Sequence, residues 1–407
     1  MATNKNKLSI RWFYLVAGTA SMLFAGIIYA WSILKTPLAE AFGWEVSQLA
    51  LNFTLTMCFF CIGGFLGSLL VKKINISIVI AAAGVLAGLG FVLTSMISGN
   101  VIVLYITYAL LAGLGIGIAY NVIISCVNAW FPDKRGLSSG CLLMGFGVST
   151  LLFGSLFDKM FAAEGIGWRK AFVIFGIVIA IVLIVAGVII KKPGKDVLFP
   201  EVKKKTTARK ENFEVKDYTT GEMVRRFSFW RAFICLVFLV AVGNSVISFA
   251  RDLAVSIGAS AALATTLVGI LSVCNGLGRI ITGAVFDSYG RRITMLGSNL
   301  ITIVAAGMIL VAVLTNSLPL GVVGLCLTGI SYGSAPTVCS AFTSAFYGQK
   351  YFATNYSVVN FTLMAASFIA TACSSLLTFS GSYIAPFVLL LALSGAALVL
   401  NFSIRRP

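Results

Sequence analysis

The sequence of 407 residues contains no histidine and only 13 aspartates and glutamates, against 30 lysines and arginines. Histidine is the commonest metal ligand and the side chain that most easily changes charge near neutral pH. All thirteen acids lie in expected loops or near expected helix ends, and the nine cysteines lie in apolar runs as small core residues. The chain therefore lacks the buried acid or histidine that acid–base or metal catalysis needs, which argues against a membrane enzyme.

Charges of either sign are scarce as well. Charged residues make up 11% of the chain, hydrophobic residues make up 59%, and the mean hydropathy is +1.00. A helix needs about twenty apolar residues to cross a bilayer, and continuous Leu, Ile, Val and Phe runs favour helices over the alternating pattern of a membrane barrel. The sequence offers twelve such runs, at residues 11–34, 47–71, 77–97, 101–128, 137–160, 168–190, 229–250, 262–285, 293–314, 318–346, 355–378 and 382–403.

The net charge of +17 would indicate a nucleic-acid partner in a soluble protein, but its distribution here is that of a membrane protein. If the first residues are placed inside the cell, the inside segments hold 24 lysines and arginines and the outside segments hold 5. Because positive loops stay on the cytoplasmic side, we expect both ends to be cytoplasmic in a prokaryotic inner membrane. The positive charge is thus topological, with anionic lipid as a secondary attraction and no nucleic acid as partner.

One positive charge breaks this pattern. Arg279 lies inside the apolar run from Leu267 to Val285, whose only other ionisable side chain is Cys274. A charge at membrane depth costs at least about 2.5 kcal/mol, so such residues usually face a polar cavity and serve function. Since no acid lies nearby in the sequence, we expect the partner of Arg279 to arrive from outside as an anion. The alternative is that Arg279 extends toward a lipid headgroup or caps a neighbouring helix.

Six of the runs precede a long polar stretch and six follow it. We expect an all-α membrane protein with an N-terminal six-helix bundle over residues 1–190 and a pseudo-symmetric C-terminal one over residues 228–407. The stretch between them, residues 191–227, contains several lysines and two prolines and is typical of a cytoplasmic linker. Its last part, Gly221 to Arg226, is compatible with a short helix at the membrane interface.

A short motif follows the run that contains the buried arginine. The pattern G-x-x-x-D-x-x-G-R-R begins at Gly283, with its acid at Asp287 and its basic pair at Arg291 and Arg292. An acid at a helix end, a glycine turn and two arginines can latch neighbouring helices on one membrane face, so we expect these three residues to act in gating. With twelve helices in two halves, the chain resembles the major facilitator superfamily. The resemblance implies paired bundles, a site between them near the midplane, and alternating access by rocking.

Three further segments narrow the resemblance. Residues 128–140 contain W-F-P-D-K-R-G, residues 11–16 are R-W-F-Y-L-V, and residues 221–223 are G-E-M. Together they look like the oxalate:formate antiporter family, the prokaryotic relatives of the monocarboxylate porters. The resemblance extends through essentially the whole chain, and the first of the three segments is its most specific element.

The resemblance implies roles for individual residues. Arg279 matches the family's arginine that engages the substrate carboxylate, and Asn275 lies one turn earlier on the same helix face. In many monocarboxylate porters the position of Asn275 is an aspartate that couples transport to protons. Tyr29, Tyr120 and Tyr332 match aromatics that line the family's pocket, although each could instead serve packing.

Several pocket positions depart from the oxalate transporter. The oxalate transporter has a second buried positive charge, a lysine, at the position that is Leu363 in this chain. Two of its pocket tryptophans correspond to Thr328 and Asn360, and one of its tyrosines corresponds to Phe146. A dianion such as oxalate would leave one carboxylate without a cation, at a desolvation cost. We therefore expect a monocarboxylate such as formate, lactate or pyruvate to be favoured. Asn275 and Asn360 could bond its hydroxyl or keto oxygen.

The coupling of transport stays open between two schemes. In anion exchange Arg279 is always occupied while the halves rock, and the absence of buried acids and histidines fits this scheme slightly better. In proton symport the proton travels with the substrate or through a marginal acid such as Asp252. Two other classes are a multidrug exporter, although cationic drugs favour a buried acid, and a sensor that binds the anion without transport. We expect a monomer whose partners are a small organic anion and the bilayer, with no cofactor or metal.

Overall fold

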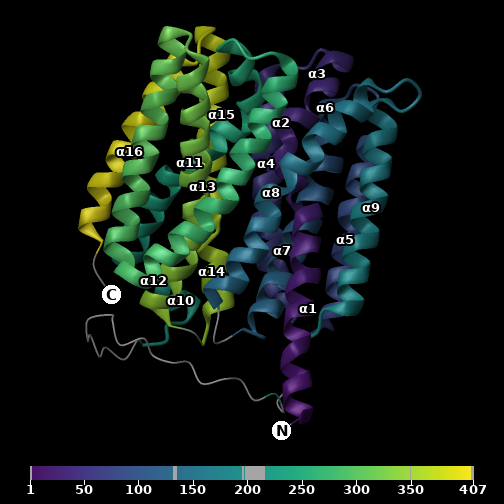
Figure 1. Cartoon of the computed structure of the whole chain (residues 1–407), viewed down its shortest axis with the longest axis vertical. Helices are drawn as coiled ribbons and strands as arrows, with labels where there is room; N and C mark the ends of the chain where they lie inside the picture. Colours follow the sequence, from purple (N-terminus) through teal and green to yellow (C-terminus); the bar gives the residue numbers. More distant parts are fainter. Residues whose placement is uncertain (1, 132–134, 195–196, 198–215, 349, 405–407) are drawn as a thin grey trace.

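The computed structural model describes residues 2–131, 135–194, 197, 216–348 and 350–404, and the remaining residues are drawn as a thin grey trace in Figure 1. Within the helices, the side chains of residues 2–8, 135, 136, 287 and 353 also lie outside this description. In the described ranges every regular element is a helix. Twelve of these helices are long and apolar enough to cross a membrane, from Ser9–Leu34 to Ile384–Ser403, which confirms the twelve predicted runs.

The first six spans lie together on one side of the molecule and the last six on the other, in purple to blue and in green to yellow (Figure 1). The first half consists of α1 (Ala2–Ala25), η1 (Gly26–Ala30), α2 (Trp31–Leu34), α3 (Thr36–Phe42), α4 (Val46–Leu70), α5 (Ile76–Thr94), α6 (Val101–Leu104), η2 (Tyr105–Ala112), α7 (Gly113–Asn128), α8 (Arg135–Ala162) and α9 (Gly167–Ile189). The second half consists of α10 (Thr220–Val224), α11 (Phe227–Ser256), α12 (Ala261–Thr315), α13 (Leu318–Tyr347), α14 (Phe352–Val359), α15 (Phe361–Ser380) and α16 (Ile384–Ser403). The predicted domain limits at residues 190 and 228 stay predictions.

Both chain ends lie toward the same face of the bundle, the lower one in Figure 1, and we call it the terminal face. The opposite face, where α3 lies, is called the far face. The short helix predicted within residues 221–226 is present as α10, at the terminal face. Its first turn is fixed by a capping box in which Thr219 and Glu222 bond each other's backbone N–H groups.

Two spans that the sequence separates are joined without a loop. The predicted runs 262–285 and 293–314 form the single element α12, which is interrupted only at Gly290, where φ is 75° and ψ is −179°. A side chain would be strained in this backbone conformation, so glycine permits the chain to reverse between two membrane helices within one residue. The glycine of the G-R-R motif is therefore the turn itself.

Close helix packing in the interior depends on small residues. A Cβ atom added to Gly117 of α7 would lie 2.1 Å from the carbonyl oxygen of Phe60 in α4, so only glycine allows this approach. The two halves meet in the same way, because a Cβ on Gly147 of α8 would lie 3.2 Å from the backbone nitrogen of Gly276 in α12. These contacts bring α8 of the first half against the span of α12 that contains Arg279.

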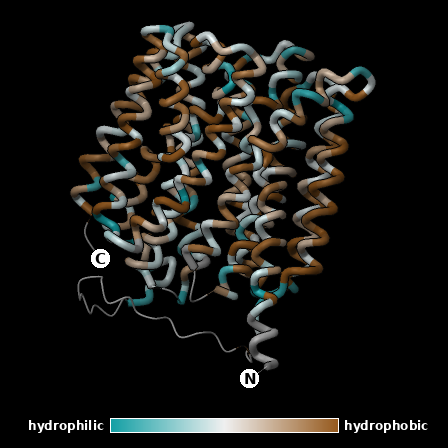
Figure 2. The backbone as a smooth tube through the Cα atoms, viewed as in Figure 1, coloured by the Kyte–Doolittle hydropathy of each residue, from teal (hydrophilic) through white to brown (hydrophobic). Residues whose placement is uncertain are grey.

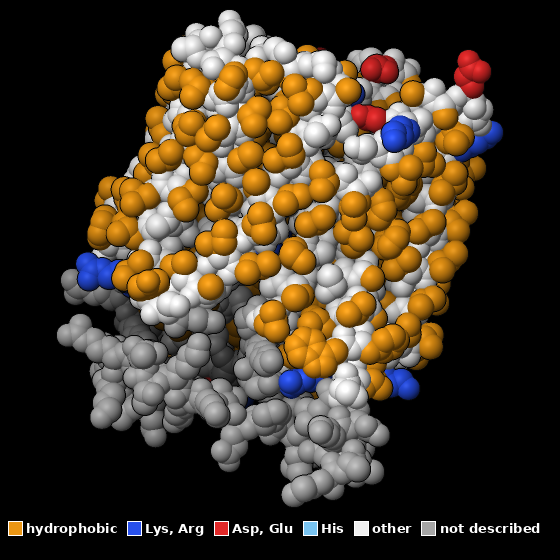
Figure 3. All heavy atoms as spheres, in the orientation of Figure 1, with side chains coloured by type: hydrophobic (Ala, Val, Ile, Leu, Met, Phe, Trp, Pro, Cys, Tyr) orange, Lys and Arg blue, Asp and Glu red, His pale blue; other side chains and the backbone are white. Residues whose placement is uncertain are grey.

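The outer surface has the pattern of a membrane protein. Apolar residues cover the sides of the helices, and hydrophilic residues gather at the two ends (Figure 2). The space-filling view shows a broad apolar belt, with charged side chains only at its upper and lower margins (Figure 3). A soluble protein rarely exposes so large an apolar surface, so the belt is the region that contacts lipid.

Candidate functional site

Arg279 lies in the interior of the bundle and is only 2% exposed. Its Nε donates a hydrogen bond to Oδ1 of Asn275 at 3.2 Å, one turn earlier in α12. Its Nη1 donates to the carbonyl oxygen of Leu143 in α8 at 2.8 Å. The guanidinium thus bridges the two halves, and its bonds point into the protein rather than toward a lipid headgroup.

The position of this arginine depends on the contact between α12 and α13. A Cβ on Gly333 of α13 would lie 2.0 Å from the carbonyl oxygen of Asn275 and 3.1 Å from its Oδ1. The missing side chain therefore lets the two helices meet at the turn that carries Asn275. Thr337, one turn further along α13, donates a hydrogen bond to the carbonyl oxygen of Arg279 at 3.3 Å. A substitution at Gly333 would displace both Asn275 and Arg279.

Two tyrosines meet between the halves beside Arg279. The hydroxyls of Tyr29 in η1 and Tyr332 in α13 lie 3.1 Å apart. Tyr332 donates to Oδ1 of Asn244 in α11 at 2.7 Å, which leaves its oxygen to accept a bond from Tyr29. The hydroxyls of Tyr29 and Tyr332 therefore form a second direct link between the halves, next to the bond from Arg279 to α8.

The wall contributed by the first half is aromatic. The ring of Phe146 in α8 lies 5.1 Å from the ring of Tyr29 and 5.1 Å from that of Tyr120 in α7, both in edge-to-face geometry. Phe60 of α4 packs against Tyr120 at 5.0 Å. These separations are in the range that aromatic pairs prefer. The result is a rigid ring cluster, and the sequence reasoning named three of its members but not Phe60.

Four buried tyrosines lie within range of the charge of Arg279. Tyr29, Tyr120, Tyr332 and Tyr356 all interact with its charge, and the side chains of Tyr120 and Tyr356 also interact with each other. Tyr356 lies in α14 and is 7% exposed. Nothing in the sequence distinguishes Tyr356 from a packing residue, although it is the fourth tyrosine around the arginine.

The site also has an unfilled hydrogen-bond donor. Nδ2 of Asn275 is buried and has no partner in the part of the chain that the structure describes. No acid forms an ion pair with Arg279 within the same described ranges. A buried donor without an acceptor is costly, so the arrangement favours a bound group that accepts hydrogen bonds and carries negative charge.

Three predicted pocket residues have different surroundings. Leu363 lies in the apolar core, and its carbonyl oxygen accepts a bond from Asn244 at 3.0 Å. The hydroxyl of Thr328 bonds within its own helix, to the carbonyl oxygen of Gly324 at 2.8 Å. Asn360 separates α14 from α15, is half-buried and interacts through its side chain with Tyr356. Asn360 is therefore near the tyrosine cluster, whereas Thr328 directs its hydroxyl along α13.

Asn244 is a polar centre outside the predicted set of site residues. Its Nδ2 donates to the carbonyl oxygen of Leu363 and, at 2.9 Å, to the hydroxyl of Ser367, while its Oδ1 accepts from Tyr332. Ser367 in turn accepts, through its carbonyl oxygen, a bond of 2.7 Å from Thr54 of the first half. An asparagine in an apolar run was the available signal, because a buried amide needs several partners.

The predicted gating residues can be followed only in part. The side chain of Asp287 lies outside the described part of the structure. Arg291 donates from Nη2 to the carbonyl oxygen of Ile404 at 3.3 Å and lies over the ring of Phe346. Arg292 is exposed at the same face. The role of these three residues in gating stays a prediction.

Charged contacts between the halves occur at the far face instead. Nζ of Lys35, after α2, lies 2.7 Å from Oδ2 of Asp252 in α11. Arg251 lies 3.9 Å from Asp158 of α8 and donates to the hydroxyl of Thr36 at 2.8 Å. Each of these contacts joins one half to the other, so they close the far side of the central site.

Comparison with known proteins places this arrangement in context. The sequence model of the Major Facilitator Superfamily matches residues 14–250 and 233–407. The uncharacterized MFS-type transporter YhjX of Escherichia coli (strain K12) is 29% identical over 88% of this chain and 86% of its own. The oxalate:formate antiporter of Oxalobacter formigenes is 30% identical over 86% and 80%. Monocarboxylate transporter 2 of Mus musculus is 26% identical over 56% and 48%.

A solved structure shares the fold. A bacterial homologue of the human lysosomal transporter Spinster, in an inward-facing and occupied conformation, superposes with a TM-score of 0.70 over 97% of this chain and 96% of that one. Its sequence identity is 16%, so the likeness concerns the fold alone.

Proposed function

Since this chain belongs to the Major Facilitator Superfamily and to the family of the oxalate:formate antiporter within it, we propose that it transports small organic monocarboxylates by alternating access. The chain is a multi-pass membrane transporter with twelve spans. In the proposal, Arg279 binds the carboxylate between the two halves, and formate-, lactate- or pyruvate-like acids are favoured over oxalate.

The single observation that carries the proposal is the environment of Arg279. Arg279 is 2% exposed, and its guanidinium donates hydrogen bonds to a backbone carbonyl and to an amide oxygen. No carboxylate among the described residues pairs with it. A substrate carboxylate would replace the neutral Leu143 oxygen with a charge-assisted, two-point contact, which is about twice as strong. The unpartnered Nδ2 of Asn275 would donate to a second oxygen of the substrate.

The preference for one carboxylate rests on a count of available cations. Among the described residues, Lys35 is the other buried lysine or arginine near the junction of the halves, and Asp252 already neutralises it at 2.7 Å. Arg251, which is less buried, is already engaged with Asp158 and Thr36. Leu363 is apolar. A dianion would therefore bring a second charge into a region with no second free cation among the described residues, and desolvation would oppose its binding.

Exchange is supported by the bonds that Arg279 makes here. Its bond to Leu143 and the contact between Tyr29 and Tyr332 tie the halves together at the centre. An anion bound to the guanidinium of Arg279 would displace its hydrogen bond to Leu143. The substrate-bound protein would therefore reorient more readily than the empty one. That behaviour is obligatory exchange.

Counterflow of a labelled monocarboxylate in proteoliposomes tests the proposal. Arg279→Lys keeps the charge but loses the planar fork, so we expect uptake to fall by about 10- to 100-fold, the loss of one charged hydrogen bond of about 1.5–3 kcal/mol. Arg225→Lys, an exposed position at the terminal face, should leave uptake unchanged. Transport by Arg279→Lys at the level of Arg225→Lys would remove Arg279 from the binding site.

Substrate preference is tested separately with oxalate as competitor. We expect oxalate to inhibit monocarboxylate counterflow at least about tenfold more weakly than formate does, because a buried unpaired charge is costly. Leu363→Lys should raise the affinity for oxalate, whereas Leu363→Met, which adds length without charge, should not. Tight inhibition by oxalate in the unaltered protein would contradict the single-cation site.

Proton symport is the second candidate, and the ion pair between Lys35 and Asp252 favours it. Asp252 is an acid that contacts the other half and whose side chain is 45% exposed, so a proton could reach it. Protonation would release Lys35 and open the far face. Uptake driven by an imposed pH gradient, and lost in Asp252→Asn, would support symport over exchange.

A further inference from the structure

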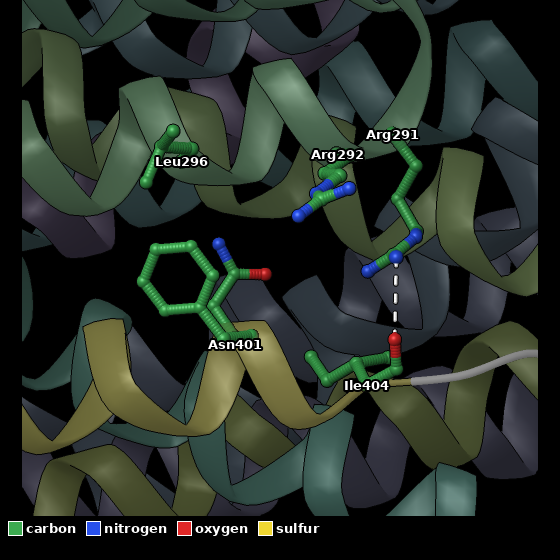
Figure 4. Close-up of a pocket in the computed structure, with 6 residues that line it drawn as sticks. Arg291, Arg292, Leu296, Asn401 and Ile404 are labelled. Atoms are coloured by element: carbon green, nitrogen blue, oxygen red, sulfur yellow. Dashed lines mark hydrogen bonds between the residues drawn. The ribbon is translucent and has the colours of Figure 1, made fainter.

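A pocket of about 240 Å³ lies at the terminal face, away from the central site. It is formed where the second span of α12 begins and α16 ends (Figure 4). Its lining consists of Arg291, Arg292, Leu296, Asn401, Phe402 and Ile404. The proposed transport cycle uses none of its polar groups as ligands, so their presence around a common space needs its own explanation.

Two of the polar side chains are available to a ligand. Arg292 is exposed and makes no hydrogen bond or ion pair with any described residue. Asn401 is only 7% exposed, and its carboxamide likewise has no hydrogen-bond partner within the described ranges. In Figure 4 the two groups face each other across the pocket. A nearly buried amide without a partner, directed at a guanidinium, is typical of a site that is completed by a ligand.

Arg291 has a structural role in the same pocket. It caps the end of α16 through the bond to Ile404, drawn as a dashed line in Figure 4, and it adds a second positive charge beside Arg292. The described lining residues include no acid. Two guanidinium groups and an amide therefore select an anion with several acceptor oxygens, and guanidinium geometry suits phosphate.

The apolar part of the lining indicates where that phosphate comes from. Leu296 and Phe402 border the pocket, and Phe402 is 63% exposed on the surface that contacts lipid. The volume is below the about 300–1,000 Å³ of pockets that enclose drug-sized ligands, so the pocket admits a compact head group. An attached chain would continue along Phe402 into the bilayer.

We propose that this pocket binds the phosphate group of an anionic phospholipid in the leaflet at the terminal face. Arg292 and Asn401 bind the phosphate oxygens, Arg291 supplies charge, and Phe402 contacts the first part of an acyl chain. Because the pocket joins α16 to the turn after Gly290, a bound lipid stabilises the packing of these two helices. This site is independent of the proposed substrate and its test does not use transport.

Native mass spectrometry of the purified full chain, titrated with phosphatidylglycerol in detergent, measures the binding directly. Arg292→Gln and Asn401→Leu should each weaken the tightest phosphatidylglycerol binding by about fivefold, the effect of one charge or one hydrogen bond at a membrane surface. Lys73→Gln is the matched control, because it removes an exposed charge from the same face outside the pocket. It should change the affinity less than twofold, within about 0.4 kcal/mol.

Two further titrations, with phosphatidylcholine and with inorganic phosphate, identify the source of the bound phosphate group. We expect phosphatidylcholine to bind more weakly than phosphatidylglycerol and millimolar inorganic phosphate to leave phosphatidylglycerol bound. If inorganic phosphate displaces the lipid, the ligand is a soluble phosphate and the proposal of a lipid is wrong. Equal phosphatidylglycerol binding by both pocket variants and Lys73→Gln would overturn the site itself. Unfolding temperatures without lipid, equal among the three variants, ensure that a loss of binding is not a loss of fold.

Discussion

The two faces of the molecule hold the halves together by different chemistry. At the far face the contacts between halves are charged, with Lys35 on Asp252 and Arg251 near Asp158. Among the described residues, the contacts found toward the terminal face are neutral: Nδ2 of Asn121 in α7 donates to the hydroxyl of Ser357 in α14 at 2.8 Å, and Cys61 Sγ contacts the carbonyl oxygen of Asn360 at 3.2 Å. Arg279 lies between these two sets of contacts.

This difference indicates how each face responds to its surroundings. Ion pairs at a water-exposed end are weakened by salt and by removal of one charge, whereas neutral hydrogen bonds are nearly indifferent to salt. The far face is therefore the closure that solution conditions can release. The described part of the terminal face depends on close packing and neutral hydrogen bonds, and it is expected to respond little to salt.

The largest effect is expected at the far face. Asp252→Asn leaves the 7%-exposed side chain of Lys35 without its negatively charged partner. Because Asp252 itself is nearly half exposed, the loss should be about 1–2 kcal/mol, which changes the open population about 5- to 30-fold. Amide hydrogen exchange in residues 31–42 and 248–257 should rise accordingly.

Two controls make this measurement specific to the ion pair. Glu40→Gln removes an exposed carboxylate from the same face and should leave exchange unchanged. Exchanging the two charges, Lys35→Asp with Asp252→Lys, should restore part of the protection. Unchanged exchange in Asp252→Asn would mean that the halves are held at this face by packing, and the contrast between the two faces would disappear.

A smaller effect is expected at the terminal face. Asn121→Ala removes the bond to Ser357 and the bond to the carbonyl oxygen of Gly64, at 2.7 Å. A neutral hydrogen bond contributes about 1 kcal/mol, so exchange in residues 354–361 should rise by up to about fivefold. Between 50 mM and 500 mM salt this change should stay constant while exchange at the far face increases.

Ser125→Ala serves as the control, since its hydroxyl bonds Asn121 within the same helix and does not reach the other half. If Asn121→Ala gives a salt-dependent change, charges outside this pair take part in the terminal closure. That result would make the two faces alike rather than different.

The architecture could be predicted from the sequence because each span is a local property. Twenty consecutive apolar residues form a helix in lipid regardless of their neighbours, and the count of twelve follows. The breaks could not be predicted in this way. The turn at Gly290 is expected from the glycine of the G-R-R motif rather than from hydropathy. The interruption at Asn360 depends on which helices pack nearby, and hydropathy does not report packing.

The candidate site was partly predictable for a related reason. Arg279 is conspicuous as a charge in an apolar run, and the spacing to Asn275 places both on one helix face. Phe60 and Tyr356 have no such local signal, because the chain contains 31 phenylalanines and 12 tyrosines and each resembles ordinary core packing. Asn244 has only the weaker signal of an amide in an apolar run. Only the fold selects those that surround the arginine.

The far-face pairs were unpredictable because their partners are distant in the chain. Lys35 and Asp252 are 217 residues apart, and each alone is a charged residue near a helix end. The motif that begins at Gly283 predicts charged contacts at the terminal face instead. Which residues pair between the halves is a property of the assembled bundle. The distribution of charge along the chain therefore predicts the topology but not the ion pairs that join the halves.

The smallest effect concerns the charged cap of α10, which lies at the terminal face outside the spans. The backbone N–H and the hydroxyl of Thr219 donate to Glu222 at 2.8 and 2.9 Å, and these bonds hold the pKa of Glu222 below its usual value of 4.5. A lowered pKa means that the cap stabilises α10 at all pH values above the unfolded pKa and is lost as pH falls through the folded one.

Exchange in residues 219–224, corrected for its intrinsic pH dependence, should therefore be constant from pH 7 to 5 and rise below about pH 4.5. Glu222→Gln can still accept both bonds but cannot titrate, so its exchange should stay flat over the whole range. A rise of equal size in Glu222→Gln would assign the acid response of this face to other groups, and the terminal closure would then share the charge dependence of the far face.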